Sequence, residues 1–80
     1  MKISEVVALR IRQILKEKKI SQYKLEQMSG ISHNTMSFLL NCKYKAANIK
    51  TVFVIIESLG MTVKEFFDSP LFDFEDMNIN

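Results

Sequence analysis

The first twenty residues place apolar side chains at the three- and four-residue spacing of an amphipathic helix, with charged side chains between them. The apolar positions are Ile3, Val7, Ile11, Ile14 and Leu15. We expect a helix of about four turns that begins with Ser4 as its N-cap. Its end falls among the cations of residues 16–19, because the helix dipole favours positive charge there.

A second, short helix is predicted over residues 22–29. Ser21 directly before it is a good N-cap, and Leu25 and Met28 are expected to face inward. Gly30 then supplies the positive φ that ends a helix and permits a sharp turn. The pattern therefore predicts two helices joined by a tight, glycine-containing turn.

The third helix covers residues 32–41 and follows Ile31, an apolar residue expected to anchor the turn in the core. Ser32 is its predicted N-cap. One face of this helix is apolar and is expected to pack inward, with Met36, Leu39 and Leu40.

The segment after residue 47 allows two interpretations. Its apolar residues keep helical spacing, but several are β-branched, so a strand competes with a helix. These residues are Ile49, Val52, Phe53, Ile56 and Leu59. Asn48 before them and Gly60 after them are typical helix boundaries and favour the helix.

A capping-box pattern, Thr62 followed by Glu65, predicts a fifth short helix that ends near Phe67, before Ser69 and Pro70 stop it. Two glycines and one proline among 80 residues, 48% of them apolar, fit a packed helical domain better than a turn-rich β fold. We therefore expect one all-α domain of five helices over residues 1–69 and an acidic, aromatic tail over residues 70–80.

Composition removes several function classes. The chain has one cysteine, Cys42, and one histidine, His33, so neither a disulfide framework nor a zinc site is expected, and a reducing cytoplasm is the expected compartment. No secretory signal or apolar run of about 18 residues is present. Without a glycine-rich phosphate loop, a cleft-forming carboxylate pair or a metal cluster, we expect no enzyme activity, no cofactor and no metal.

The charge is unevenly distributed along the chain. Residues 1–50 carry a net charge of +7 and residues 51–80 a net charge of −5, within a total of +2. This asymmetry fits a polyanion-binding front and an acidic back. The predicted helix–glycine turn–helix has the layout of a helix-turn-helix, whose second helix offers a polar face to base edges in the major groove. On the third helix, the residues away from the predicted core face are His33, Asn34, Ser37 and Phe38.

From about residue 5 to residue 67, the ordered residues resemble the Cro/C1-type family, the phage repressor-like or XRE helix-turn-helix proteins. The resemblance runs through Ile20-Ser21-Gln22, Leu25, Gly30-Ile31-Ser32, Thr35-Met36-Ser37, Leu39, Asn41, Lys43, Asn48-Ile49-Lys50-Thr51-Val52, Ser58-Leu59-Gly60-Met61-Thr62 and Glu65-Phe66-Phe67. It implies a compact lambda-repressor-like domain whose second and third helices form the helix-turn-helix. It also implies binding to operator-like double-stranded DNA, usually as a dimer.

The resemblance assigns residue roles by position. The residues it assigns to base contact are His33, Asn34, Ser37 and Phe38. Phosphate contact falls to Gln22, Thr35, Asn41, Lys43, Lys45 and Lys50. The side chains suit these roles: Asn reads adenine, His bonds a purine edge, and Phe38 can pack on a thymine methyl. The lysines and Gln22 position the protein without specifying sequence.

Three positions depart from the family pattern, and a fourth departure involves a pair. Glu26 stands where a small Ala is common, so the helices could cross more widely or Glu26 could bend to solvent. Cys42 replaces the Gly that usually ends the third helix, so its left-handed cap is lost or strained. Ala47 replaces a frequent Pro. Leu15 and Leu40 replace a paired Arg and Glu, and we expect these two leucines to touch.

The sequence leaves two functions open. The first is a sequence-specific transcriptional regulator, a homodimeric repressor of phage or mobile-element type. The second is an antitoxin-like or adaptor protein whose tail binds a protein partner. The aromatic residues near the end of the chain could serve either as a dimer interface or as part of the core. They are Phe66, Phe67, Leu71, Phe72 and Phe74.

Overall fold

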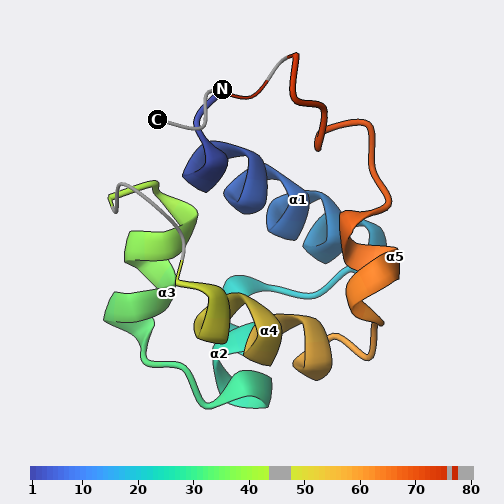
Figure 1. Cartoon of the computed structure of the whole chain (residues 1–80). Helices are drawn as coiled ribbons and strands as arrows, with labels where there is room; N and C mark the ends of the chain where they lie inside the picture. Colours follow the sequence, from blue (N-terminus) through green and yellow to red (C-terminus); the bar gives the residue numbers. More distant parts are fainter. Residues whose placement is uncertain (44–47, 76, 78–80) are drawn as a thin grey trace.

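The computed structural model describes residues 1–43, 48–75 and 77. Within them the chain forms five helices: α1 (Ile3–Lys18), α2 (Gln22–Ser29), α3 (His33–Leu40), α4 (Ile49–Ser58) and α5 (Val63–Phe67). Figure 1 shows α3 and α5 on opposite sides of the molecule, with α1 and α4 between them. The predicted all-α, five-helix fold is confirmed, and α4 settles the choice between helix and strand.

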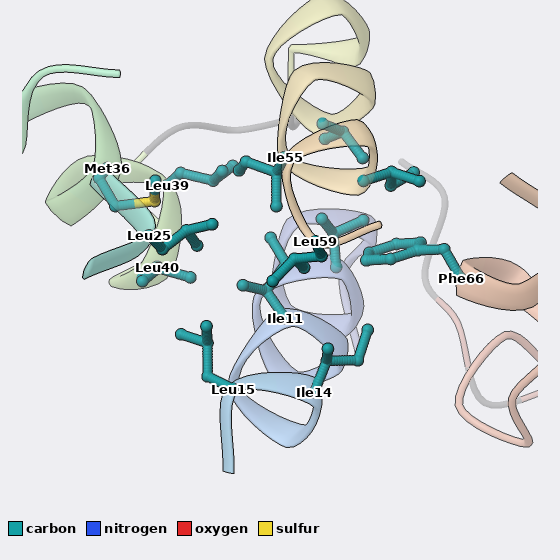
Figure 2. Packing of buried hydrophobic residues seen from close by; sticks show 13 residues of the cluster. Ile11, Ile14, Leu15, Leu25, Met36, Leu39, Leu40, Ile55, Leu59 and Phe66 are labelled. Atoms are coloured by element: carbon teal, nitrogen blue, oxygen red, sulfur yellow. The ribbon is translucent and has the colours of Figure 1, made fainter. Parts of the chain in front are cut away.

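One buried cluster receives side chains from all five helices. Figure 2 shows α3 and α5 contributing from opposite sides, with α1 and α4 between. Its members are Val7, Ile11, Ile14, Leu15, Leu25, Met36, Leu39, Leu40, Val52, Ile55, Ile56, Leu59 and Phe66. Because each fully buried aliphatic or aromatic side chain contributes about 1.5–3 kcal/mol, this cluster holds the helices in place.

Side-chain caps start four of the helices as expected. The hydroxyl of Ser21 accepts from the amide of Lys24 at 3.0 Å, and that of Ser32 accepts from the amide of Thr35 at 3.2 Å. Asn48 caps α4 through two amides, and Thr62 with Glu65 forms the predicted capping box. These hydrogen bonds satisfy amides that the first turn of a helix leaves unpaired.

The first helix begins two residues earlier than predicted. Lys2, not Ser4, is its N-cap, and Ser4 is buried inside the first turn with 3% of its surface exposed. The carboxylate of Glu5 accepts from the Lys2 amide at 3.1 Å, which satisfies the N-cap amide without a serine. The prediction for Ser4 is therefore wrong, and the first helical residue is Ile3, which is partly buried against the core.

Helix α3 ends with a left-handed residue even though it has no glycine there. Cys42 has φ of 57°, its amide donates to the carbonyl of Leu39 at 3.3 Å, and the Lys43 amide donates to the carbonyl of Phe38 at 2.9 Å. These two bonds are the Schellman pattern. The cap is therefore kept rather than lost, and the strain of a left-handed side-chain-bearing residue is about 1–2 kcal/mol.

Met28, which was expected to face inward, is exposed, and so are two apolar residues of α4. Met28 lies on the outer side of α2, and on α4 Ile49 and Phe53 stand one turn apart with 63% and 46% of their surfaces exposed. Helix α4 carries more apolar residues than one face can bury, and Ile55 takes a core place that the spacing did not assign to it. Ile31 packs half-buried against the core as expected.

The end of the described chain packs back on α5. Phe66 is fully buried, and the rings of Phe67 and Phe72 meet edge-on with centroids 4.9 Å apart. Arg10 of α1 secures this end, because its Nε donates to the carbonyl of Phe66 and another guanidinium nitrogen donates to that of Glu65. The start of the predicted tail therefore belongs to the packed domain. No helix among the described residues is long and apolar enough to cross a membrane.

Candidate DNA-reading surface

The turn between α2 and α3 is short because Gly30 adopts a left-handed conformation with φ of 73°. Its amide donates to the carbonyl of Glu26 at 2.9 Å and closes α2. A Cβ at this position would meet no atom within 4 Å, so the need for glycine comes from the backbone alone. The serine cap of α3 follows two residues later, and the two helices pack against each other as predicted.

Helix α3 has one buried face and one open face. Met36, Leu39 and Leu40 hold it to the core, and each is at most 3% exposed. The opposite face carries the four residues assigned to base reading: exposed His33, Asn34 and Phe38, and half-buried Ser37. A helix presented in this way can enter the major groove, which is wide enough for one α-helix.

Four polar side chains join the open face of α3 to α2 in a closed ring. The amide nitrogen of Gln22 donates to Glu26 at 2.9 Å and to the hydroxyl of Ser37 at 3.2 Å. Nδ1 of His33 lies 2.9 Å from the same Glu26 oxygen, and its Nε2 lies 3.4 Å from Ser37 Oγ. We call these four residues the seam ring.

Glu26 is the charged acceptor of the seam ring and bonds both Gln22 and His33. Its side chain is only 10% exposed, while that of His33 is 72% exposed. The hydrogen bond from Gln22 lowers the pKa of Glu26, desolvation opposes this shift, and the bond and charge of His33 lower the pKa further. Glu26 is therefore held as a carboxylate.

One of the two expectations for Glu26, that its side chain bends out to solvent, is wrong. The side chain is only 10% exposed, and one of its carboxylate oxygens is bonded to both Gln22 and His33. The other expectation, a wider crossing of the two helices, stays a prediction. The signal that could have found it was the four-residue spacing from Gln22 to Glu26 and from His33 to Ser37, which puts each pair on one face of its helix. What the spacing could not supply was the angle between the helices.

The leucines that replace an ion pair lie in one hydrophobic cluster. Leu15 is 8% exposed and Leu40 is 3% exposed, and both belong to the single buried cluster of the described residues. Figure 2 shows them at the end of the cluster where α1 meets α3. Burial of both side chains fits an exchange in which the two charged partners are replaced together.

Arg12 is a functional candidate that sequence reasoning missed. Its guanidinium donates to the carbonyl of Leu40 at 3.1 Å and to the side-chain oxygen of Asn41 at 3.3 Å. It therefore closes the end of α3 and engages Asn41, a residue assigned to phosphate. An exposed cation beside the reading helix suits a polyanion partner.

The remaining residues assigned to phosphate lie around α3. Lys43 is exposed just beyond its end, and Lys50 is exposed in the first turn of α4. Thr35 is half-buried and shares a hydrogen bond with the Ser32 cap at 3.0 Å. Gln22 is half-buried at the start of α2. Lys45 falls outside the described residues, as do Tyr44 and Ala47.

A match to a family model agrees with this geometry. Residues 10–70 match the Cro/C1-type HTH DNA-binding domain. No curated protein and no solved structure matches the chain significantly. The matched region contains the turn, the reading helix and both helices that follow them, and it covers most of the 80 residues. The chain therefore belongs to the Cro/C1-type HTH DNA-binding family and is a DNA-binding protein of the transcription-regulator class.

Proposed function

We propose that this protein is a sequence-specific transcriptional repressor of phage or mobile-element type that inserts α3 into the major groove of an operator as a homodimer. The observation that carries the proposal is the open face of α3, where exposed His33 and Asn34 project from a helix whose other face is anchored by buried leucines. A rigid backing with exposed polar tips is what direct readout of bases requires.

The four positions assigned to base reading divide by chemistry. Asn34 can accept and donate to adenine at once, and His33 and Ser37 each offer one hydrogen bond to a base edge. Phe38 is 47% exposed and offers an apolar ring to a thymine methyl group. The site we propose is therefore rich in A·T pairs.

Phosphate contacts come from the rim of this face. Gln22, Thr35, Asn41, Lys43, Lys45 and Lys50 are the residues we assign to the DNA backbone. Arg12 joins them because it lies at the end of α3. These groups set affinity and register rather than sequence, and each neutralised phosphate adds about 0.9 to the salt slope of binding.

For the homodimer, two recognition helices must lie about 34 Å apart to reach successive major grooves. The aromatic residues assigned to its interface divide in this structure. Phe66 is fully buried and Phe67 and Phe72 pack on the core, whereas Leu71 is half-buried and Phe74 is 80% exposed. We therefore centre the proposed interface on Leu71 and Phe74.

A second candidate function rests on the exposed side chain of Phe74. Phe74 stands between Asp73 and Glu75, and an exposed aromatic flanked by carboxylates suits a partner with an apolar, basic groove. This protein would then act as an antitoxin-like or adaptor protein through its tail. The two functions are compatible, because the tail begins beside α5, on the side of the molecule opposite α3, before it runs back toward the N-terminus (Figure 1).

Binding-site selection followed by mobility shift at several salt concentrations tests the main function. We expect an A·T-rich, two-fold symmetric site and a steep loss of affinity with salt. Lys50→Ala should lower the salt slope by about 0.9, whereas Lys64→Ala, on α5, should leave it unchanged. Equal affinity for all sequences would contradict the proposal.

Truncation after residue 72 separates the two roles of the tail, because it leaves Phe72 on the core. If the tail serves a protein partner, the truncated chain keeps its dimer and its DNA affinity. If the tail serves self-association, sedimentation should show monomers and the affinity for a two-fold site should fall.

A further inference from the structure

The seam ring fixes the direction of its hydrogen bonds. A carboxylate has no hydrogen to donate, so each partner of Glu26 must present a donor to it. The amide of Gln22 must therefore turn its nitrogen toward Glu26, and His33 must carry a proton on Nδ1. Ring-nitrogen roles follow from the bond the other nitrogen makes, and here that bond is to a carboxylate.

Ser37 agrees with the same assignment. Its oxygen accepts from the Gln22 nitrogen at 3.2 Å, which leaves its own hydrogen available for Nε2 of His33 at 3.4 Å. A hydroxyl hydrogen directed at Nε2 requires that nitrogen to be unprotonated. Each hydrogen-bond donor in the seam ring therefore has an acceptor when His33 is neutral with its proton on Nδ1.

We propose, resting on the DNA-reading function above, that Glu26 is a positioning residue that makes His33 a hydrogen-bond acceptor and so selects an exocyclic amino group, adenine N6 or cytosine N4. The 3.4 Å contact to Ser37 is long, and the ring is 72% exposed, so a base can reach Nε2. In the major groove only adenine and cytosine present such a donor.

Without Glu26, the same histidine would read the opposite chemistry. Neutral imidazole in water prefers its proton on Nε2, which turns the outward nitrogen into a donor. A donor there suits the N7 and O6 acceptors of guanine. Exchanging a residue on α2 therefore changes the base preferred by a residue on α3, although the α2 residue itself meets no base.

The proposal concerns the neutral ring, so its tests belong above the titration range of imidazole. Within the described residues, the hydrogen bonds of His33 go to Glu26 of α2 and Ser37 of α3, and no ion pair or hydrogen bond joins the ring to α1, α4 or α5. Glu26 is therefore the one titratable group bonded to the ring in the part of the chain described.

The first test needs no DNA. Because the chain has a single histidine, a long-range proton–nitrogen NMR spectrum of the imidazole contains one set of ring signals. At about pH 8, above the usual imidazole pKa, we expect a protonated Nδ1 in the unmodified protein and a protonated Nε2 in Glu26→Ala. A protonated Nε2 in the unmodified protein overturns the proposal and requires no variant.

The second test measures base preference at the same pH by binding-site selection. The unmodified protein should prefer adenine or cytosine at one position by roughly fivefold or more, and His33→Ala should lose the preference there alone. Glu26→Ala should move it to guanine. Gln27→Ala is the matched control, because Gln27 is exposed on α2 and bonds Tyr23 instead of the seam ring, and it should change nothing.

The two tests separate this inference from the function it rests on. If the unmodified protein binds no sequence preferentially, the proposed function fails and the inference fails with it. If it binds a defined site and Glu26→Ala keeps the same base at the His33 position, the inference alone is overturned. A move to guanine, together with the change of protonated nitrogen, supports it.

Discussion

The α2–α3 end and the α5 end lie on opposite sides of α1 and α4, and different contacts hold them (Figure 1). At α5 the contacts are buried aromatic rings and an arginine on main-chain carbonyls. At the α2–α3 seam the outer contacts are hydrogen bonds among partly exposed side chains. Exposed polar contacts add little stability, whereas buried apolar ones add much. The α5 end therefore stabilises the fold, and the seam is suited to orienting side chains.

The largest expected effect comes from Phe66→Ala at the α5 end. The ring is fully buried against Phe67 and Phe72, so its removal should lower the free energy of unfolding by about 3–5 kcal/mol. Chemical denaturation measures this. Phe74→Ala is the control, because that ring is 80% exposed, and it should change stability by less than about 0.5 kcal/mol. Equal losses of unfolding free energy in the two variants would mean that Phe74 is also packed against the core.

The next effect compares a glycine at each end. Gly30 of the seam and Gly60 before α5 have φ of 73° and 71°, and a Cβ at either position meets nothing within 4 Å. Replacing either glycine with Ala should therefore lower the free energy of unfolding by a similar amount, about 1–2 kcal/mol. A larger loss at Gly30, measured by thermal unfolding, would show that the seam adds a constraint beyond the backbone.

A smaller effect of opposite sign is expected at the end of α3. Cys42→Gly should raise the free energy of unfolding by about 0.5–1 kcal/mol, because glycine adopts a φ of 57° without strain. Cys42→Ala keeps the strain and serves as the control. If alanine stabilises as much as glycine, the strain is not in the backbone.

The smallest effect concerns acid. The pKa of Glu26 is lowered by its bond from Gln22, and that of Glu65 is lowered by the backbone and side chain of Thr62, below the ordinary glutamate value of 4.5. A lowered native pKa stabilises the fold above 4.5, and this contribution disappears as pH falls through the native value. The free energy of unfolding, measured by chemical denaturation from about pH 6 to about pH 3, should therefore fall as these two carboxylates take up protons.

Glutamine variants assign this acid loss to each end. Glu65→Gln and Glu26→Gln should each flatten the decline of stability with pH, because the group that takes up the proton has been removed. A decline of unchanged slope in both variants would mean that other carboxylates cause it.

How far the sequence predicts this molecule depends on the range of each interaction. The caps at Ser21, Ser32, Asn48 and Thr62 were predictable, because each one bonds an amide two or three residues away. The seam ring was not predictable, since it needs the crossing of two helices. The Arg10 bonds to α5, which span more than fifty residues, were missed for the same reason.

The errors in burial have another origin. Spacing assigns a residue to a face but does not say how many residues that face can bury. Met28 and Phe53 keep the expected spacing and are exposed, because Leu25 and Ile55 already fill the core beside them. The residues assigned to DNA contact remain predictions, and the selection and NMR experiments above address them directly.

The eight-residue length of α3 limits how many base pairs one copy can contact in the proposed complex. Eight residues at 1.5 Å per residue span about 12 Å, which covers roughly four base pairs at 3.4 Å each. A sequence of roughly four base pairs recurs on the order of once in a few hundred base pairs of random DNA. If α3 reads bases as we propose, one chain contacts only a short sequence, and recognition of a longer site requires a second chain bound at a fixed distance.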